Sequence, residues 1–336
     1  MSLFLSRLGV RRSSSVSLLL SKALSTNSLR RQTPPCSIMG AIPSENGLGR
    51  LEVAYANQRS VTDLDKMIPL ELVFKEYDDE KTLTIGASHG WIATLKEDGI
   101  LRLVDDLNPV ASDANPKRIP LPPLVTLPHC QTNIITNDLS SAFCKPAGQS
   151  PEWTNIKIEN PCFCSSSRVM FSDLEDTSSG HGTLAGSDDP KLHKVQFQNL
   201  TKLHMATREL MDSCFTIEHL VESRPTRETF LVKQYKKTAK NKEGVDIMKT
   251  EFLMVFKLDD EGNAVYTQDM GDLAMFLSMS EPFCVPASSF PGSMFLIIYD
   301  YDEMGIVDVS DIPFYLHSAS GPHSVPYQIP PQDIEN

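Results

Sequence analysis

The stretch that decides the fold runs from residue 251 to residue 310: EFLMVFKLDDEGNAVYTQDMGDLAMFLSMSEPFCVPASSFPGSMFLIIYDYDEMGIVDVS. Its short apolar runs are separated by clusters of Asp, Gly and Pro, which is the pattern of β-strands joined by turns. No grouping typical of a catalytic site occurs in it. The stretch therefore predicts hairpins with two acidic turns, and it leaves the activity open.

The same pattern extends towards the N-terminus. Residues 82–106 alternate strand and turn signals, with a hairpin loop at 96–99. Residues 118–124 are too rich in proline for a central strand. Residues 201–212 place apolar side chains at near-helical spacing and predict one clear helix. Many short strands with almost no helix indicate an all-β sandwich, barrel or propeller, and no exact repeat selects among them.

Composition and cysteine usage bound the class of protein. The 336 residues are 40% hydrophobic, which allows a sizeable core in one large or two modest domains. The 23 prolines and 17 glycines favour many short elements joined by turns. Seven scattered cysteines without a secretory segment predict a reducing compartment. No apolar run has the length of a membrane-spanning helix.

Charge is distributed unevenly along the chain. The net charge is −12, but residues 1–40 hold six basic residues and no acid, so the remainder carries −18. A body this acidic repels phosphate, and nucleic acid is not the expected partner. The exception to test is the lysine-rich segment Lys233–Lys242 (KQYKKTAKNK), predicted as a loop.

The first residues have the composition of a targeting segment. Residues 1–31 are rich in Arg and Ser and free of acid, which is typical of an organellar transit peptide. We expect a disordered presequence at 1–40, a linker at 41–68, a propeller domain at 69–316 and a flexible tail at 317–336. Early arginines favour mitochondria, with chloroplast or dual targeting as the alternative.

Several pieces in order between residues 70 and 315 carry a family resemblance. They are GASHGWIATL, ILRLVDDLNP, PEWTNIKI, EHLVESRPTRETFLVKQYKK, FLMVFKLDDEGN and GDLAMFLSMSEPFCVPASSFPG. Together they resemble the plant family called domain of unknown function 295, of KIB type. The resemblance implies a kelch-like β-propeller with one or two short helices. It also implies the organelle-targeted set that lacks an F-box, and it supplies no catalytic residues.

This chain departs from that family in three places, and one of them is that Arg224 and Arg227 stand where smaller residues are usual. Residues 173–182 (DLEDTSSGHG) are shorter than the usual piece, and the chain passes from Phe290–Gly292 directly to the next strand. These departures leave open whether every blade of the propeller is complete.

One pattern matches a nucleophile motif. Gly86-Ala87-Ser88-His89-Gly90 fits G-x-S-x-G, which in hydrolases places the serine on a strand-to-helix turn. Here a strand and a hairpin loop follow it instead of a helix. We therefore expect a glycine-flanked turn at the start of a blade strand, with a hydrolase as the weaker reading.

Two further patterns suggest metals, and each has an ordinary alternative. Soft ligands for zinc are spaced as Cys162, Cys164, His181 and His193, although one residue between the cysteines is uncommon. Asp300, Asp302, Gly305 and Asp311 sit like positions of a calcium loop, but Met304 occupies a ligand position and no helices flank the segment. We expect buried thiols in the first case and a hairpin turn in the second.

The sequence thus favours a non-enzymatic mitochondrial propeller that binds protein partners, with no assigned catalytic, cofactor or metal residues and no evident small-molecule substrate. Two alternatives remain at this stage. One is an organellar RNA-associated factor that uses Lys233–Lys242, because lysines interleaved with an aromatic residue can bind single strands. The other is an enzyme with a site in the propeller channel, to which the Gly86–Gly90 motif would belong.

Overall fold

The protein is described by a computed structural model. The residues it describes are 32–58, 60–74, 82–123, 139–144, 153–158, 196–198, 205–224, 226–241, 244–259, 261, 263–289, 295–299, 303–308 and 327–334. Within them the chain forms five β-sheets, one α-helix, α1 (Met205–Asp212), and the 3₁₀ turns Leu70–Leu72 and Ala287–Ser289.

The strands follow the chain from one sheet to the next. The second sheet contains β4 (Leu83–Ser88), β5 (Trp91–Leu95), β6 (Leu101–Val104) and β7 (Arg118–Pro120), and the third contains β8 (Leu139–Cys144) and β9 (Trp153–Ile158). The fourth contains β10 (Phe197–Gln198), β11 (Phe215–Ser223), β12 (Glu228–Lys240), β13 (Asp246–Leu258) and β14 (Ala264–Thr267). The fifth contains β15 (Leu273–Ser278), β16 (Phe283–Pro286), β17 (Phe295–Tyr299) and β18 (Met304–Asp308). The first sheet, here called the closing sheet, has the order β19-β1-β2-β3 and combines β1 (Cys36–Pro43), β2 (Leu48–Tyr55), β3 (Val61–Pro69) and β19 (Gln328–Ile329).

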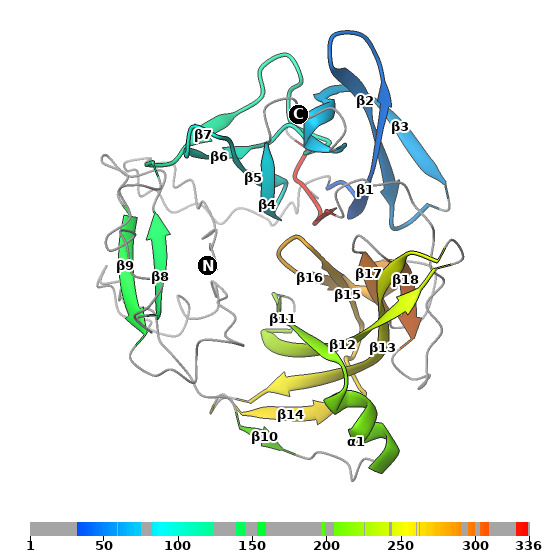
Figure 1. The fold of residues 1–336 in the computed structure, drawn as a ribbon. Coiled ribbons are helices and arrows are strands. Elements are labelled where there is room, and N and C mark those ends of the chain that lie inside the picture. The colour runs from blue at the N-terminus through cyan, green and yellow to red at the C-terminus, as the bar shows by residue number, and fades with distance from the viewer. Residues whose placement is uncertain are drawn as a thin grey trace, which may run out of the picture.

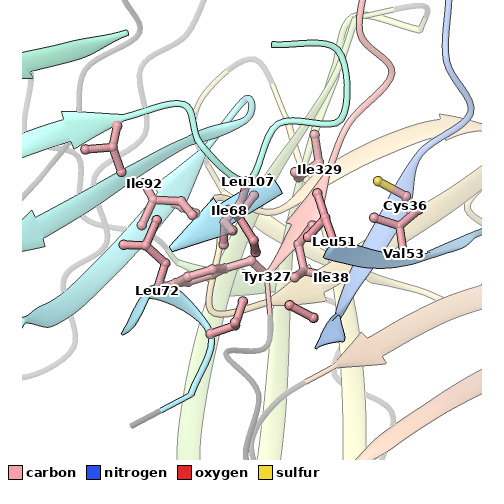
Figure 2. Packing of buried hydrophobic residues seen from close by; sticks show 14 of the residues in the cluster. Cys36, Ile38, Leu51, Val53, Ile68, Leu72, Ile92, Leu107, Tyr327 and Ile329 are labelled. Carbon is pink, nitrogen blue, oxygen red and sulfur yellow. The ribbon is translucent and has the colours of Figure 1, made fainter. Parts of the chain in front are cut away.

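The five sheets stand around a ring (Figure 1). Apolar side chains hold neighbouring sheets together. One buried cluster joins the closing sheet to the β4–β7 sheet. In Figure 2, Ile92 of β5 and Leu107, which follows β6, lie beside Ile68 of β3 and Tyr327, which precedes β19. Another joins the β10–β14 sheet to the β15–β18 sheet through residues such as Val232 and Met275. The arrangement is an all-β propeller whose blades are these sheets, and the predicted fold class is confirmed.

The closing sheet takes strands from both ends of the described chain. Cys36 pairs with Ile329, and Ser37 pairs with Gln328, while β1 pairs on its other side with β2. The expected linker at 41–68 is therefore wrong, because it forms most of β1–β3. The expected flexible tail at 317–336 is wrong over 327–334, where Tyr327 is only 2% exposed. The presequence, expected to reach residue 40, overlaps β1 from Cys36.

Local turn chemistry explains the hairpins. Asn46 and Gly47, at φ 60° and 71°, make the turn between β1 and β2, and Asn-Gly is a strong hairpin signal because both residues tolerate positive φ. The hairpins predicted within 82–106 are confirmed as β4–β6, and Gly99 donates its N–H to the carbonyl of Lys96 at 3.0 Å. The predicted helix is confirmed over Met205–Asp212.

Candidate functional site

Three clusters of polar side chains lie where sheets meet. The rim cluster consists of Ser88, His89 and Glu281. The bulge cluster consists of Lys236, Glu303, Thr250, Gln234 and His219. The aspartate cluster consists of Lys66, Asp105, Asp106 and Arg118. Each cluster contains side chains that could act in catalysis, so its geometry decides between a catalytic and a structural role.

The rim cluster joins the end of β4 to the turn after β15. Ser88 Oγ donates a hydrogen bond to Glu281 Oε2 and lies 2.9 Å from His89 Nδ1, which is 3.4 Å from the same carboxylate oxygen. The backbone brings these groups together, because Ala87 bridges Ser280 and accepts the N–H of Glu281 at 2.7 Å.

This geometry differs from that of a serine hydrolase. His89 and Gly90, at φ 50° and 83°, form the two-residue turn between paired Ser88 and Trp91, so the chain continues into β5 and not into a helix. A triad needs the imidazole between nucleophile and carboxylate, with one ring nitrogen facing each. Here Nδ1 alone faces both groups, and Ser88 contacts the carboxylate directly. The cluster connects two sheets.

The segment beside the rim cluster also holds β19. Ser280 Oγ donates to the carbonyl of Gln328 and accepts its N–H, both at 2.8 Å. Ser280 and Gln328 are 6% and 1% exposed. The turn from Ser278 to Glu281 therefore contacts the β4–β7 sheet on one side and the closing sheet on the other.

The bulge cluster surrounds a buried carboxylate. The pairing of β12 with β13 shifts after Tyr235, so Lys236 pairs with Thr250 and Glu251 is the extra residue of a β-bulge. At this bulge Thr250 donates its backbone N–H to both oxygens of Glu303, at 3.0 and 2.9 Å. Lys236 Nζ lies 3.1 Å from Glu303 Oε1, and these side chains are 4% and 2% exposed.

Further hydrogen bonds extend this cluster across the β10–β14 sheet. Gln234 Nε2 donates to Thr250 Oγ1 at 2.6 Å, and Gln234 Oε1 lies 3.1 Å from His219 Nε2. Since Glu303 precedes β18, the cluster ties β11, β12 and β13 to the neighbouring sheet. Buried charges are tolerated when they are paired and hydrogen-bonded in this way, which indicates a structural role.

The lysine-rich segment is a strand, and its prediction as a loop is wrong. Residues 233–240 are the second half of β12. Lys233 pairs with Glu218 at 2.9 Å and lies 4.3 Å from the ring centre of Phe197, and Lys236 is the buried partner of Glu303. Lys240 lies 3.5 Å from Asp246. These acids already neutralise much of the charge that RNA binding would require.

The aspartate cluster joins β3 to the region around β6 and β7. Lys66 Nζ donates to the carbonyl of Ala111 at 2.5 Å. Burial lowers the pKa of Lys66, and the nearby Asp105, Asp113 and Asp106 oppose that shift. Arg118 Nη2 lies 2.9 Å from Asp106 Oδ1. Lys66 therefore connects β3 to the neighbouring sheet, whereas Arg118 and Asp106 form an ion pair within the β4–β7 region.

A family model described as KIB1-4 beta-propeller matches residues 60–315, about three quarters of the chain. The chain belongs to the KIB1-4 β-propeller family. No curated protein and no solved structure matches the sequence. The KIB-type resemblance found in the sequence motifs is thus confirmed at the level of the propeller family.

The metal patterns in this KIB1-4 propeller fall largely outside the described residues. Cys162, Cys164, His181 and His193 all lie there, as do Asp300, Asp302 and Asp311. Gly305 belongs to β18. In the part of the chain that the structure describes, no group of three or more His, Cys, Asp and Glu side chains could hold a metal ion. Over the same residues, none of the helices is long and apolar enough to span a bilayer.

Three of the buried polar residues that the structure of this KIB1-4 propeller describes, Ser280, Glu303 and Gln328, escaped sequence reasoning. Glu303 is one residue from the aspartates considered for calcium, yet it pairs with a lysine distant in sequence. Ser280 and Gln328 likewise are distant in sequence and come into contact only because their sheets are neighbours in the ring. Glu303 was hidden in an acidic run that looked like a turn, and no local signal existed for Ser280.

Proposed function

We propose that this KIB1-4 propeller is a non-enzymatic platform for protein–protein interaction that acts in mitochondria. In this proposal it belongs to the organelle-targeted branch of the plant family called domain of unknown function 295, without an F-box. The family match to a propeller that is not a known enzyme family supports the non-enzymatic part. The acid-free, Arg-rich residues 1–31 support mitochondria, with chloroplast or dual targeting as the alternative.

The proposal rests on the contrast between the polar clusters, which hold the sheets together, and the exposed apolar side chains at strand ends. Each of the three polar clusters has a contact between neighbouring blades: Ser88 with Glu281, Lys236 with Glu303, and Lys66 with the carbonyl of Ala111. The most exposed large apolar side chains instead lie at strand ends and turns: Phe215 begins β11, Leu83 begins β4, Val245 precedes β13 and Met279 follows β15. Propellers present strand ends and loops to their partners.

The test is recovery of a partner from isolated mitochondria. A tagged full-length chain is purified alongside an unrelated matrix protein that carries the same residues 1–31, and co-purifying proteins are identified by mass spectrometry. We expect a protein recovered only with the propeller that binds it again when both are purified. Recovery of the chain alone, in repeated preparations, would contradict the platform.

A second measurement tests the non-enzymatic part. The purified chain is treated with a fluorophosphonate probe, which reacts with activated serines, and the Ser88→Ala variant is the matched control. We expect no labelling that depends on Ser88, because its hydroxyl donates to Glu281 and lacks the order of groups of a triad. Labelling that the Ser88→Ala variant loses would favour the enzyme alternative.

A further inference from the structure

The folded ring begins well before the part of the chain that matches the family. The match starts at residue 60, whereas among the described residues Gln32 already forms a β-bridge with Asp333. Gln32 Nε2 also donates to Asp333 Oδ1 at 2.9 Å. Thr33 donates its N–H to the carbonyl of Gln332 at 2.9 Å and accepts the N–H of Gln332 on its hydroxyl at 3.0 Å.

The strand that follows is an interior strand of its sheet. β1 pairs with β19 on one edge and with β2 on the other, so its loss would unpair both neighbours. Its side chains at Cys36, Ile38 and Ala41 are 2%, 0% and 3% exposed and belong to the cluster that joins the closing sheet to the β4–β7 sheet. Residues 36–41 are therefore part of the core.

From this arrangement we infer that proteolytic processing of this protein removes only residues upstream of Gln32. The inference rests on the proposed import into mitochondria. An organellar endopeptidase hydrolyses one peptide bond at or before the Arg31–Gln32 bond. Water supplies the atoms for a new carboxylate on the released segment and a new α-amino group on the mature chain. The mature protein keeps the whole closing sheet.

The charge of the new terminus favours the same boundary. An α-amino group is largely protonated near neutral pH, since its pKa is about 7.7–8.0. Gln32 is exposed, so an ammonium there stays in water. A cut after Pro35 would place it on Cys36, where an unpaired charge would be buried. The expected presequence boundary at residue 40 would remove most of β1.

The first experiment follows the full-length chain into isolated mitochondria and determines the N-terminus of the protease-protected product by mass spectrometry. We expect a product that begins at Gln32 or before it. A product that begins at Cys36 or later overturns the inference while leaving the location intact. Absence of any imported, shortened product overturns the location and the processing step together.

The second experiment tests the boundary without import. Chains 32–336 and 42–336 are compared with the full chain by thermal unfolding, and chains 1–334 and 1–326 are the matched pair at the other end. We expect 32–336 and 1–334 to unfold cooperatively at the midpoint of the full chain, and 42–336 and 1–326 to lose that transition. A chain 42–336 that unfolds like the full chain, or a chain 32–336 that does not, would overturn the inference.

Discussion

Two junctions between blades do the same task with different chemistry. At the closing junction, between the closing sheet and its neighbours, β19 is held by backbone pairing, apolar packing and the neutral hydroxyl of Ser280. At the bulge junction, between the β10–β14 and β15–β18 sheets, an apolar cluster is accompanied by the buried ion pair of Lys236 and Glu303. Both junctions are buried, but one depends on apolar packing and a neutral hydroxyl and the other on an ion pair, so they are sensitive to different changes.

The largest effect is expected at the bulge junction. Replacing Glu303 by alanine leaves Lys236 buried without its counter-charge and Thr250 without its acceptor, and breaking a buried pair on one side costs about 3–5 kcal/mol. The free energy of unfolding, measured in urea, should fall by that amount. The double variant Glu303→Leu with Lys236→Met is the control and should recover much of the loss, because it buries no unpaired charge. Equal losses in both variants would mean that charge is not the cause.

At the closing junction the largest expected effect comes from an apolar side chain. Ile38 is fully buried between sheets, and Ile38→Ala should lower the free energy of unfolding by about 3 kcal/mol through lost burial and a cavity. Ile42 lies on the same strand and is 37% exposed, so Ile42→Ala is the matched control and should cost less than about 1 kcal/mol. Similar values for the two variants would show that β1 does not pack as described.

The neutral polar contact should matter less than either. Ser280→Ala leaves the N–H and carbonyl of Gln328 without their hydroxyl partner in a buried place, which costs about 1–2 kcal/mol. Ser288→Ala, which removes an exposed hydroxyl bonded to Asp272, is the control and should change stability by less than about 0.5 kcal/mol. A loss from Ser280→Ala as large as that from Glu303→Ala would remove the distinction between the junctions.

The smallest effect is expected in a test of how often each junction opens, in the unsubstituted protein and in the Ser280→Ala variant. Burial raises the pKa of Cys36 to about 12 at the closing junction and that of Cys284, which faces Glu222 of β11, to about 11. Because the thiolate is the reactive form and a free thiol titrates near 8.5, alkylation at pH 8 requires opening. We expect both thiols to react far more slowly than in the unfolded chain, and Cys36 to become more reactive in Ser280→Ala while Cys284 does not change. Equal acceleration of both thiols would mean that the junctions open together.

The parts of the fold that sequence could predict were the locally encoded ones. Alternating apolar residues and turn chemistry predicted β4–β6, the hairpins of the 251–310 stretch and α1. The closing sheet was missed because β19 has two residues and no periodicity, and its pairing partner is far away in sequence. The Asn46-Gly47 turn was a local signal that could have shown strands in the expected linker.

The candidate sites divide in the same way. The turn at Ser88–Gly90 was predictable because glycine favours tight turns. The structure shows why glycine is needed there: Gly90 has φ 83°, and an added Cβ would come within 2.6 Å of Asn108 Nδ2. The contact of Ser88 with Glu281 was not, because it depends on the position of one blade relative to another. Lys233–Lys242 was misjudged for a related reason. A run of lysines is typical of a solvated loop. Only the strand pairing shows that Lys233 and Lys236 form ion pairs with Glu218 and Glu303.

The pairing of Cys36 with Ile329 sets the order of events when the protein is made. Ribosomes add roughly 5–20 residues per second, so β1 emerges about 15–60 s before the strand that covers its edge. During that interval a strand with buried apolar side chains has an unpaired edge, which is the usual template for aggregation. A molecular chaperone that binds extended apolar segments would therefore be needed early in the life of each chain. Mutations that weaken the pairing of β19 with β1 would leave that edge exposed even after synthesis is complete.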